Sequence, residues 1–384
     1  MKIAIPMERR EHEKRVAATP DTVKKFIALG MDVIIEAGAG TASSFSDQSY
    51  IDAGATIAKD AAAALKDADV VLKVQRPVTK AEGGPDEMSL IKKGAVLVSV
   101  LAPLQNKEQV TAYAAAGIEA HAMELVPRIS RAQSMDVLSS QSNLAGYKAV
   151  LDAAGEYDRV MPMMMTAAGT VAPAKVFIMG VGVAGLQAIA TARRLGAVVT
   201  ATDVRAATKE QVESLGAKFV MVDSDEAGDG GGGYAKEMSD DYKKKQAALV
   251  FEHIKKQDIV ITTALIPGRA APILITDEML DVMKRGSVIV DLAVDAGGNV
   301  AQSALGEVVE TASGVKIVGH HNIPSRLASD ASALYAKNLL NFLQPMINKE
   351  NGQLEMNWED EIILGTGLTR DGKVVHPLLT DGGN

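Results

Sequence analysis

The chain has 384 residues, a length that suits two domains, and 47% of them are apolar, which is enough for a sizeable core. The formal net charge of −8 argues against nucleic acid as the main ligand, and the absence of cysteine excludes disulfides, thiolate chemistry and cysteine-ligated metals. No apolar run reaches the roughly 18 residues that span a bilayer, and the N-terminus lacks the apolar region of a secretory signal.

Strand-like and helix-like segments alternate through the first third of the chain. Short runs of β-branched residues predict buried strands, and capped segments with apolar residues at helical spacing predict helices. The predicted strands are 2–6, 31–38, 69–74 and 94–101, and the predicted helices are 19–30 and 107–117. This alternation indicates parallel strands joined by crossover helices.

The pattern changes at residues 128–136, where the sequence "RISRAQSMD" gathers polar side chains. The stretch fits a solvated loop, and it fits equally a segment that holds a substrate. A long helix is predicted over 135–157, followed by a loop that contains Met163, Met164 and Met165. Three successive methionines favour core packing or the lining of a hinge over a metal site.

A second alternating series follows. Its predicted strands are 174–180, 197–204, 217–222, 259–265, 287–294 and 315–321, and its predicted helices are 185–196, 208–216 and 277–286. The apolar spacing of a last helix, 330–347, would let that helix pack back on the first domain. We therefore expect an α/β protein of two Rossmann-like domains with parallel sheets, the first formed by 1–138 plus 328–384 and the second by 139–327.

An acidic, glycine-rich segment lies between these elements, at residues 223–238. It lacks apolar periodicity and cannot contribute to a core, so we expect a mobile surface loop over about 223–240. One interpretation is a disordered insertion. The other is a lid that closes over a ligand, with Tyr234 and Met238 as contacts.

A glycine-rich turn follows the first strand of the second series. Gly180, Gly182 and Gly185 form the pattern G-x-G-x-x-G directly between a predicted strand and a predicted amphipathic helix. In a dinucleotide-binding unit the first glycine permits the tight turn, the second lets the backbone approach the pyrophosphate, and the third lets helix and strand pack closely. The pyrophosphate then meets the N-terminal end of the helix, whose amides and dipole favour an anion.

The next predicted strand ends at Asp203, whose carboxylate would accept hydrogen bonds from the ribose hydroxyls of an adenosine. A carboxylate at this position repels the 2′-phosphate of NADP, so the pattern favours NAD(H). Arg205 follows closely and could bind a 2′-phosphate, which leaves NADP(H) as the alternative.

Two further loops follow strands of the same domain, where ligand contacts gather. Ala264 and Leu265 are expected near the nicotinamide, and Asp295 is either a ligand contact or a turn-former. His320 and His321 also follow a strand, although a loop with satisfied side chains is the favoured interpretation for them. The sequence thus indicates an NAD(H) site without an evident residue for proton transfer.

Residues 1–30 and 179–197 resemble the corresponding stretches of the alanine dehydrogenase/nicotinamide nucleotide transhydrogenase family. The resemblance runs from residue 1 to about residue 380. Within the family, residues 128–150, 202–219 and 232–238 resemble the soluble NAD(H)-binding component of the proton-translocating transhydrogenase, which is the first portion of a split alpha subunit.

The other branch of this family, alanine dehydrogenase, provides one alternative function, an amino-acid oxidoreductase; a non-catalytic NAD-sensing module is the second alternative. That branch carries a lysine in a K-V-K-E-P stretch where this chain has Gln75, and a catalytic histidine where this chain has Ala102. Neither replacement can handle the substrate in the same way, although Arg15 and Asp295 are retained.

The resemblance implies direct hydride transfer from NADH to NADP⁺ by a transhydrogenase of the Si-Re stereospecific type. It implies NAD(H) bound in the cleft between the two domains and NADP(H) bound on a partner subunit. Further implied partners are a membrane-spanning proton-channel subunit and a second copy of the chain. The implied location is the cytoplasmic face of the inner membrane.

The residues expected to hold the dihydronicotinamide and its ribose, by resemblance, are Arg128, Gln133, Asp136 and Ser139. The other expected contacts of the dinucleotide are Ile129, Ser130, Gly180, Val181, Gly182, Val183, Gly185, Asp203, Val204, Arg205, Gly233, Tyr234, Gln246 and Leu265. No metal ligand is expected.

Overall fold

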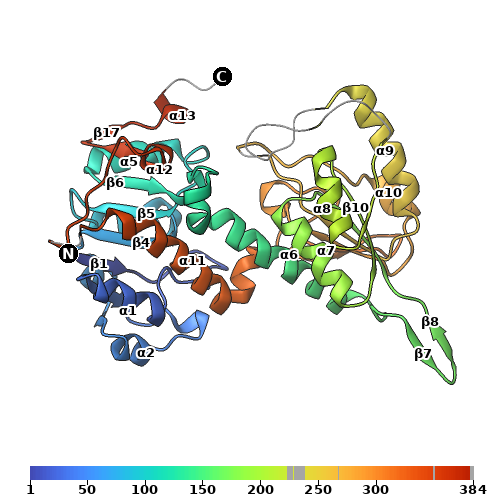
Figure 1. Cartoon of the computed structure of the whole chain (residues 1–384), viewed down its shortest axis with the longest axis horizontal. Coiled ribbons are helices and arrows are strands. Elements are labelled where there is room, and N and C mark those ends of the chain that lie inside the picture. The colour runs from blue at the N-terminus through green and yellow to red at the C-terminus, as the bar shows by residue number, and fades with distance from the viewer. Residues whose placement is uncertain (223–227, 229–237, 267, 349–350, 381–384) are drawn as a thin grey trace. The chain divides into compact units, whose positions relative to one another are not determined.

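A computed structural model describes residues 1–222, 228, 238–266, 268–348 and 351–380 (Figure 1). The chain divides into two compact units, the first made of Met1–Gln141 with Ser325–Asn384 and the second of Ser142–Pro324. Each unit is built on a sheet whose strands are parallel, apart from one edge strand in the second unit. The predicted α/β class with parallel sheets is therefore confirmed.

The first unit has a six-stranded parallel sheet with the order β3-β2-β1-β4-β5-β6. Its strands are β1 (Lys2–Ile5), β2 (Asp32–Glu36), β3 (Thr56–Ala58), β4 (Val70–Gln75), β5 (Val96–Val100) and β6 (Glu119–Ala122). Its helices are α1 (Pro20–Ala28), α2 (Asp47–Asp52), α3 (Ala61–Leu65), α4 (Glu87–Leu90), α5 (Lys107–Ala116), α11 (Ala328–Leu343), α12 (Glu361–Thr366) and α13 (Pro377–Thr380). A small hairpin joins β16 (Thr369–Arg370) to β17 (Lys373–Val374).

Alternate residues along the strands of this sheet enter two different cores. Ile3 and Ile5 pack with side chains of α1, α2 and α11 on one face, whereas Ala4 packs with α3 and α5 on the other. A strand that is buried on both faces must be apolar almost throughout, which explains the continuous β-branched runs of the sequence. Thr19 caps α1 through a capping box with Thr22, at the start of the predicted helix 19–30.

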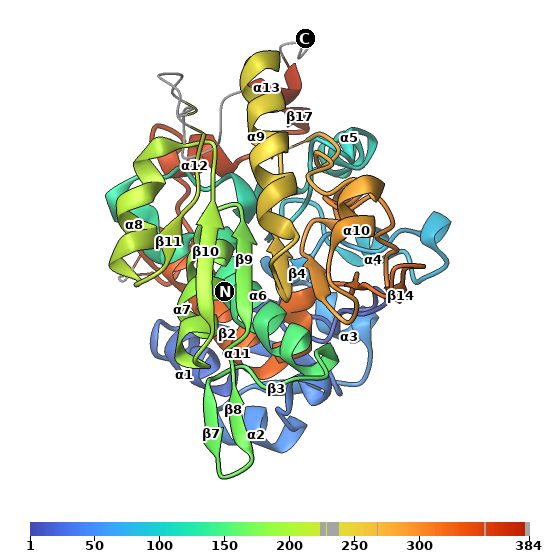
Figure 2. The same ribbon diagram turned by 90° about the vertical axis from the view of Figure 1, so that its right-hand side faces the viewer.

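The second unit has a seven-stranded sheet with the order β11-β10-β9-β12-β13-β15-β14, in which only β14 runs antiparallel to its neighbour among the described strands. Figure 2 shows β11, β10 and β9 side by side. Its strands are β9 (Lys175–Met179), β10 (Val198–Thr202), β11 (Lys218–Phe219), β12 (Ile259–Thr262), β13 (Val288–Asp291), β14 (Val308–Glu310) and β15 (Lys316–Val318). Its helices are α7 (Val183–Arg194), α8 (Lys209–Ser214), α9 (Asp240–Ile254) and α10 (Asp277–Val282). The division between the units falls within α6 (Val137–Glu156).

Several elements were not predicted from the sequence: β6, α9, the antiparallel β14, and a hairpin of β7 (Met164–Thr166) and β8 (Gly169–Val171). The hairpin extends away from the sheet of its unit (Figures 1 and 2). Met163, Met164 and Met165 are 61%, 44% and 79% exposed. The interpretation of these methionines as core packing is therefore wrong, because the hairpin carries them into solvent. Among the described residues, none of the helices could span a lipid bilayer.

The strand order reverses at one point in each sheet. The chain first adds strands on one side of the first strand and then continues on its other side. In the second unit this point lies between β9 and β12, and in the first unit between β1 and β4. In open α/β sheets, ligands bind outside the carboxyl ends of the strands at such a point. The glycine-rich turn follows β9, so the fold places it at the switch point of the second unit.

Candidate functional site

The turn after β9 requires glycine at its first position. Gly180 has φ +101°, and its amide donates a hydrogen bond to the carbonyl of Thr202 at 2.9 Å. A Cβ at this position would lie 2.5 Å from Oγ1 of Thr263, on the loop that follows β12. Both the backbone conformation and the close approach of the neighbouring loop therefore exclude a side chain.

The other two glycines of the motif differ from each other in their surroundings. A Cβ on Gly185 would lie 2.0 Å from the carbonyl oxygen of Gly180, so glycine is needed there for packing within the protein. Among the described residues, a Cβ on Gly182 would meet no atom within 4 Å apart from its own chain neighbours. Gly182 is the N-cap of α7 and provides no side-chain cap. The space beside the helix N-terminus is thus available to a ligand.

Asp203 closes the same turn from the end of β10. The residue is 9% exposed, and its Oδ2 accepts the amide of Val181 at 2.7 Å. The guanidinium of Arg205 forms an ion pair with the same carboxylate at 2.7 Å. Val204, next in the chain, packs beside a small cluster of Val222, Met238 and Tyr242. The structure therefore brings the expected contacts 180–185 and 203–205 together.

Leu265 is 51% exposed on the loop after β12. Asn299, which the sequence analysis missed, holds this loop in place. Asn299 is fully buried; it accepts the amide of Ala264 at 3.0 Å and donates to the carbonyls of Ala264 at 2.9 Å and Pro272 at 2.8 Å. The buried carboxylate of Asp291 in turn accepts the amide of Asn299 at 2.8 Å. A polar residue directly after a glycine pair was the signal that could have indicated this clamp.

The remaining expected contacts of the second unit are less closely grouped. Val183 begins α7 and is 38% exposed, and Gln246 is half-buried on α9. Gly233 and Tyr234 lie outside the described residues, as does most of the expected loop. Helix α9 begins at Asp240, so the last residue of that expected loop is helical.

In the first unit the polar stretch at 128–136 forms a short 3-10 helix, η4 (Ser130–Met135). Ile129 is its N-cap, and Arg128, Ser130 and Gln133 are exposed. Helix α11 holds η4 from behind, since the side-chain amide of Asn338 donates to the carbonyl of Ser134 at 2.8 Å. The contact with α11 thus fixes the backbone that carries the side chains of this stretch.

Asp136 and Ser139 also contact each other directly. The carboxylate of Asp136 accepts the amide of Ser139 at 2.9 Å and its hydroxyl at 2.6 Å. A carboxylate that accepts an amide of the first helical turn acts as a helix cap, so the pair stabilises the start of α6. This structural role accompanies the role expected for the two residues in ligand binding.

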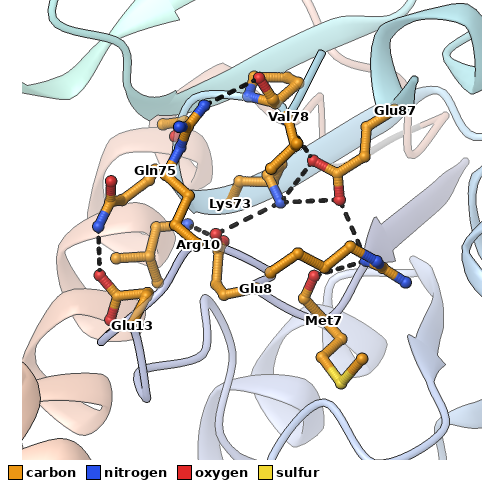
Figure 3. Close-up of polar contacts among 12 residues, drawn as sticks. Met7, Glu8, Arg10, Glu13, Lys73, Gln75, Val78 and Glu87 are labelled. Atoms are coloured by element: carbon orange, nitrogen blue, oxygen red, sulfur yellow. Dashed lines mark hydrogen bonds and ion pairs between the residues drawn. The ribbon is translucent and has the colours of Figure 1, made fainter. Parts of the chain in front are cut away.

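The second unit has a glycine-rich turn at its switch point, whereas the first unit has a group of charged side chains near its own switch point (Figure 3). Gln75 donates to Glu13 at 2.7 Å, and Arg15 donates to Glu13 and, at 2.9 Å, to Gln141. Burial by itself would raise the pKa of the Glu13 carboxyl, but the Arg15 guanidinium and the hydrogen bonds from Arg15 and Gln75 lower it to about 2. Gln75 is therefore engaged by the protein itself.

Lys73 lies deeper in the same network and is 1% exposed. Its ammonium group is 3.4 Å from the Glu8 carboxylate and 3.2 Å from the Glu87 carboxylate (Figure 3). Arg9 adds a second cation at 3.1 Å from Glu87. Burial raises the pKa of the Glu8 carboxyl, although Lys73 opposes the change. The cluster is a buried ion network that connects β4 to the segment after β1.

Glu124 is a titratable group that the sequence analysis missed. Its carboxylate accepts the amides of Leu101 and Ala102, and Ala102 has φ +47°. Burial raises the pKa of Glu124 to about 7, although these backbone hydrogen bonds lower it.

Asp295, expected as a contact or a turn-former, lies in a 3-10 turn with its carboxylate 4.0 Å from Nδ1 of His321. The described residues hold no group of three or more potential metal ligands.

Comparison with known families covers nearly the whole chain. Residues 4–145 match the family described as "Alanine dehydrogenase/PNT, N-terminal domain", and residues 149–377 match "Alanine dehydrogenase/PNT, C-terminal domain". A solved structure described as "The crystal structure of transhydrogenase from Sinorhizobium meliloti" is 56% identical and has a TM-score of 0.88 over 98% of this chain and 100% of that one. An "L-alanine dehydrogenase" structure is 27% identical, with a TM-score of 0.80 over 99% and 98%.

Curated relatives give the same picture. A protein of Rhodospirillum rubrum, named as the first portion of NAD(P) transhydrogenase subunit alpha, is 62% identical over the full length of both chains. "NAD(P) transhydrogenase subunit alpha" of Haemophilus influenzae is 45% identical over 98% of this chain and 72% of its own. An "Alanine dehydrogenase" of Mycolicibacterium smegmatis is 33% identical over 78% of this chain and 74% of its own.

Proposed function

The chain belongs to the alanine dehydrogenase/PNT family, and on that basis we propose that it is the NAD(H)-binding component of a proton-translocating NAD(P) transhydrogenase. Relatives named as transhydrogenase alpha subunits support an oxidoreductase role of this kind. The observation that carries the proposal is the turn after β9, where Gly182 leaves open space at the N-terminus of α7. Bound NADH would supply a hydride to NADP⁺ held by a partner subunit, in the Si-Re stereospecific manner.

The residues of the chain would bind and orient the dinucleotide. Asp203 would accept the adenosine ribose hydroxyls, and the amides at the start of α7 would bind the pyrophosphate. Arg128, Gln133, Asp136 and Ser139 would hold the nicotinamide carboxamide and its ribose. Catalysis would then come from positioning two rings in a site from which water is excluded.

Hydride transfer between two nicotinamide rings requires no proton from the protein. Gln75 and Ala102 stand where the alanine dehydrogenase branch was expected to carry a lysine and a histidine, and neither side chain is ionisable. Their replacement therefore agrees with a transhydrogenase and removes two groups that an amino-acid dehydrogenase would use.

A reconstitution assay tests the proposal. The purified chain is mixed with NADH and an NADP⁺ analogue, with and without a separately purified NADP(H)-binding subunit. We expect reduction of the analogue only when the partner subunit is present. Alanine-dependent formation of NADH by the chain alone would contradict the proposal.

An alanine dehydrogenase-like activity is the second candidate, and one observation favours it. The pKa of the Glu124 carboxyl is raised by burial to about 7, so this group could move a proton near neutral pH at the end of the strand where Ala102 stands. The alanine arm of the same assay separates the two functions.

Gln133→Ala is expected to slow hydride transfer at least roughly tenfold while NADH affinity changes less than about threefold, because a positioning group acts mainly on the reacting geometry. Single-turnover kinetics and calorimetry measure the two effects. Ser134→Ala, at the next exposed position of η4, is the matched control. Equal losses in transfer and in binding would show that Gln133 binds NADH uniformly.

The proposal includes a homodimer and docking on membrane-bound partners at the cytoplasmic face of the inner membrane. The exposed methionines of the β7–β8 hairpin support the first point, because a projecting apolar surface is typical of a site that a second protein covers. We expect Met165→Glu to shift the protein towards monomer in sedimentation velocity. Leu305→Glu, at an exposed loop position of the same unit, should leave the dimer intact. A dimer unaffected by Met165→Glu would place the interface elsewhere.

A further inference from the structure

The carboxylate of Asp203 accepts four hydrogen bonds within the protein. Oδ1 accepts the amide of Arg205 at 2.9 Å and its Nε at 2.8 Å. Oδ2 accepts the amide of Val181 at 2.7 Å and Nη2 of Arg205 at 2.7 Å. A carboxylate offers about four acceptor positions in total. All of them are therefore taken before any ligand is bound.

These four donors fall into two kinds. The amides of Val181 and Arg205 belong to the backbone, and they remain in place as long as the turn and the end of β10 keep their conformation. The other two donors, Nε and Nη2, belong to one guanidinium group and leave the carboxylate together when that side chain rotates. They approach different oxygens, as the two parallel donors of a bidentate arginine do.

The vicinal hydroxyls of a ribose present the same pattern to a carboxylate. The 2′- and 3′-hydroxyls are two neighbouring donors, and in a dinucleotide-binding unit they bind the acidic residue at this position. With the backbone amides retained, the only acceptor positions that can be vacated on Asp203 are the two that Arg205 fills. The guanidinium and the ribose diol thus require the same two positions.

We propose that Arg205 is an internal competitor of the adenosine ribose, which must leave Asp203 before NAD(H) can bind fully, and that it thereby determines affinity and nucleotide selectivity. The inference deepens the proposed function and rests on it. While the Arg205 guanidinium is bound to Asp203, it neutralises a carboxylate whose side chain is only 6% exposed. Once it is displaced, its charge remains beside the ribose, where it attracts a 2′-phosphate and weakens discrimination against NADP(H).

Arg205→Met tests the proposal, because methionine keeps an aliphatic side chain and removes the fork. Calorimetry with the full chain should show NADH bound about three- to tenfold tighter and NADPH bound more weakly than by the wild type, since a partly buried ion pair is lost only from the competing state. Arg205→Lys keeps the positive charge and loses the two parallel donors of the guanidinium. Its affinities for NADH and NADPH should lie between those of the wild type and those of Arg205→Met. Arg194→Met, an exposed arginine at the end of α7, controls for net charge and should change neither affinity.

The diol itself is tested with adenosine 5′-monophosphate and its 2′,3′-dideoxy analogue. The gain from Arg205→Met should appear with the first ligand and vanish with the second, which has no hydroxyls to place on Asp203. Weaker binding of NADH by Arg205→Met, or an equal gain with the dideoxy analogue, would overturn the proposal.

Asp203→Asn separates failure of this inference from failure of the proposed function. If Asp203→Asn weakens NADH binding and Arg205→Met does not tighten it, only the competition is refuted. If neither variant changes NADH affinity, the ribose does not bind at Asp203, and the proposed binding site fails with the inference.

Discussion

Gly185→Ala is expected to destabilise the protein by about 3 kcal/mol or more, since its methyl group would lie 2.0 Å from the carbonyl oxygen of Gly180. That oxygen belongs to the backbone of a tight turn and cannot move aside without displacing β9 from α7. Urea-induced unfolding, followed by circular dichroism, measures the loss. A free energy of unfolding equal to that of the wild type would show that helix and strand can separate at no cost.

Gly182→Ala is expected to have the opposite effect: it should weaken NADH binding and leave the stability nearly unchanged. Its Cβ would meet no atom of the described residues within 4 Å beyond its chain neighbours, and the residue has φ −82°, which alanine adopts readily. Stability should therefore change by less than about 1 kcal/mol. The added methyl group would occupy the space proposed for the pyrophosphate, so NADH binding should weaken roughly tenfold or more.

The contrast between the two glycines separates a packing role from a ligand role. Gly155→Ala is the matched control, because a Cβ at this position on α6 also meets no described residue within 4 Å beyond its own helix, and the position lies outside the turn. It should change neither stability by more than about 1 kcal/mol nor NADH affinity. NADH binding by Gly182→Ala at wild-type affinity would show that the open space does not receive the nucleotide.

Lys73→Met is expected to destabilise the first unit by about 3–5 kcal/mol, because it removes one partner of a buried ion network. Glu8 and Glu87 lie 3.4 and 3.2 Å from the Lys73 ammonium, and both are left with less compensation. Urea-induced unfolding measures the effect. Lys92→Met, which removes an ion pair with Asp69 at the surface, is the control and should cost less than about 1 kcal/mol.

The loss caused by Lys73→Met should depend on pH. Burial already raises the pKa of Glu8 above its usual value, and removal of the Lys73 cation raises it further. A carboxyl group with a raised pKa stabilises the fold when it is protonated, and this stability is lost as the pH rises through its folded pKa. The variant should therefore be less impaired at acid pH than at pH 8.

A second substitution checks the cause. Glu8→Gln in the Lys73→Met background removes one uncompensated charge and keeps an oxygen that can accept the amide of Val74. It should recover some of the lost stability at pH 8 and little at acid pH. A loss that is independent of pH and unaffected by Glu8→Gln would indicate packing, not charge, as the contribution of Lys73.

Much of the secondary structure could be predicted because its signals are local. The buried strands β1, β4, β9 and β13 are short apolar runs, and Thr19 and Gly30 mark the two ends of α1. Helix α9 was missed because most of its side chains are polar and only Tyr242, Val250 and Ile254 are buried. Its apolar face is too narrow to give a clear helical period.

The hairpin that carries Met164 and Met165 was missed for a different reason. Its residues are apolar and yet exposed, and sequence patterns indicate burial from polarity alone. No local feature distinguishes an apolar segment that enters the core from one that projects into solvent. Only the path of the chain through space decides between the two.

The sequence by itself determined the strand–turn–helix unit at Gly180–Gly185, because backbone conformation and side-chain periodicity are properties of neighbouring residues. The tertiary structure alone decided which polar groups pair across long stretches of the chain. Gln75 meets Glu13, and Asn299 clamps Ala264, because parallel strands bring together segments that are remote in the chain. Hydrogen bonds act over about 3 Å, so the partners of such remote groups depend on where the folded backbone places each side chain and not on the spacing of residues in the sequence.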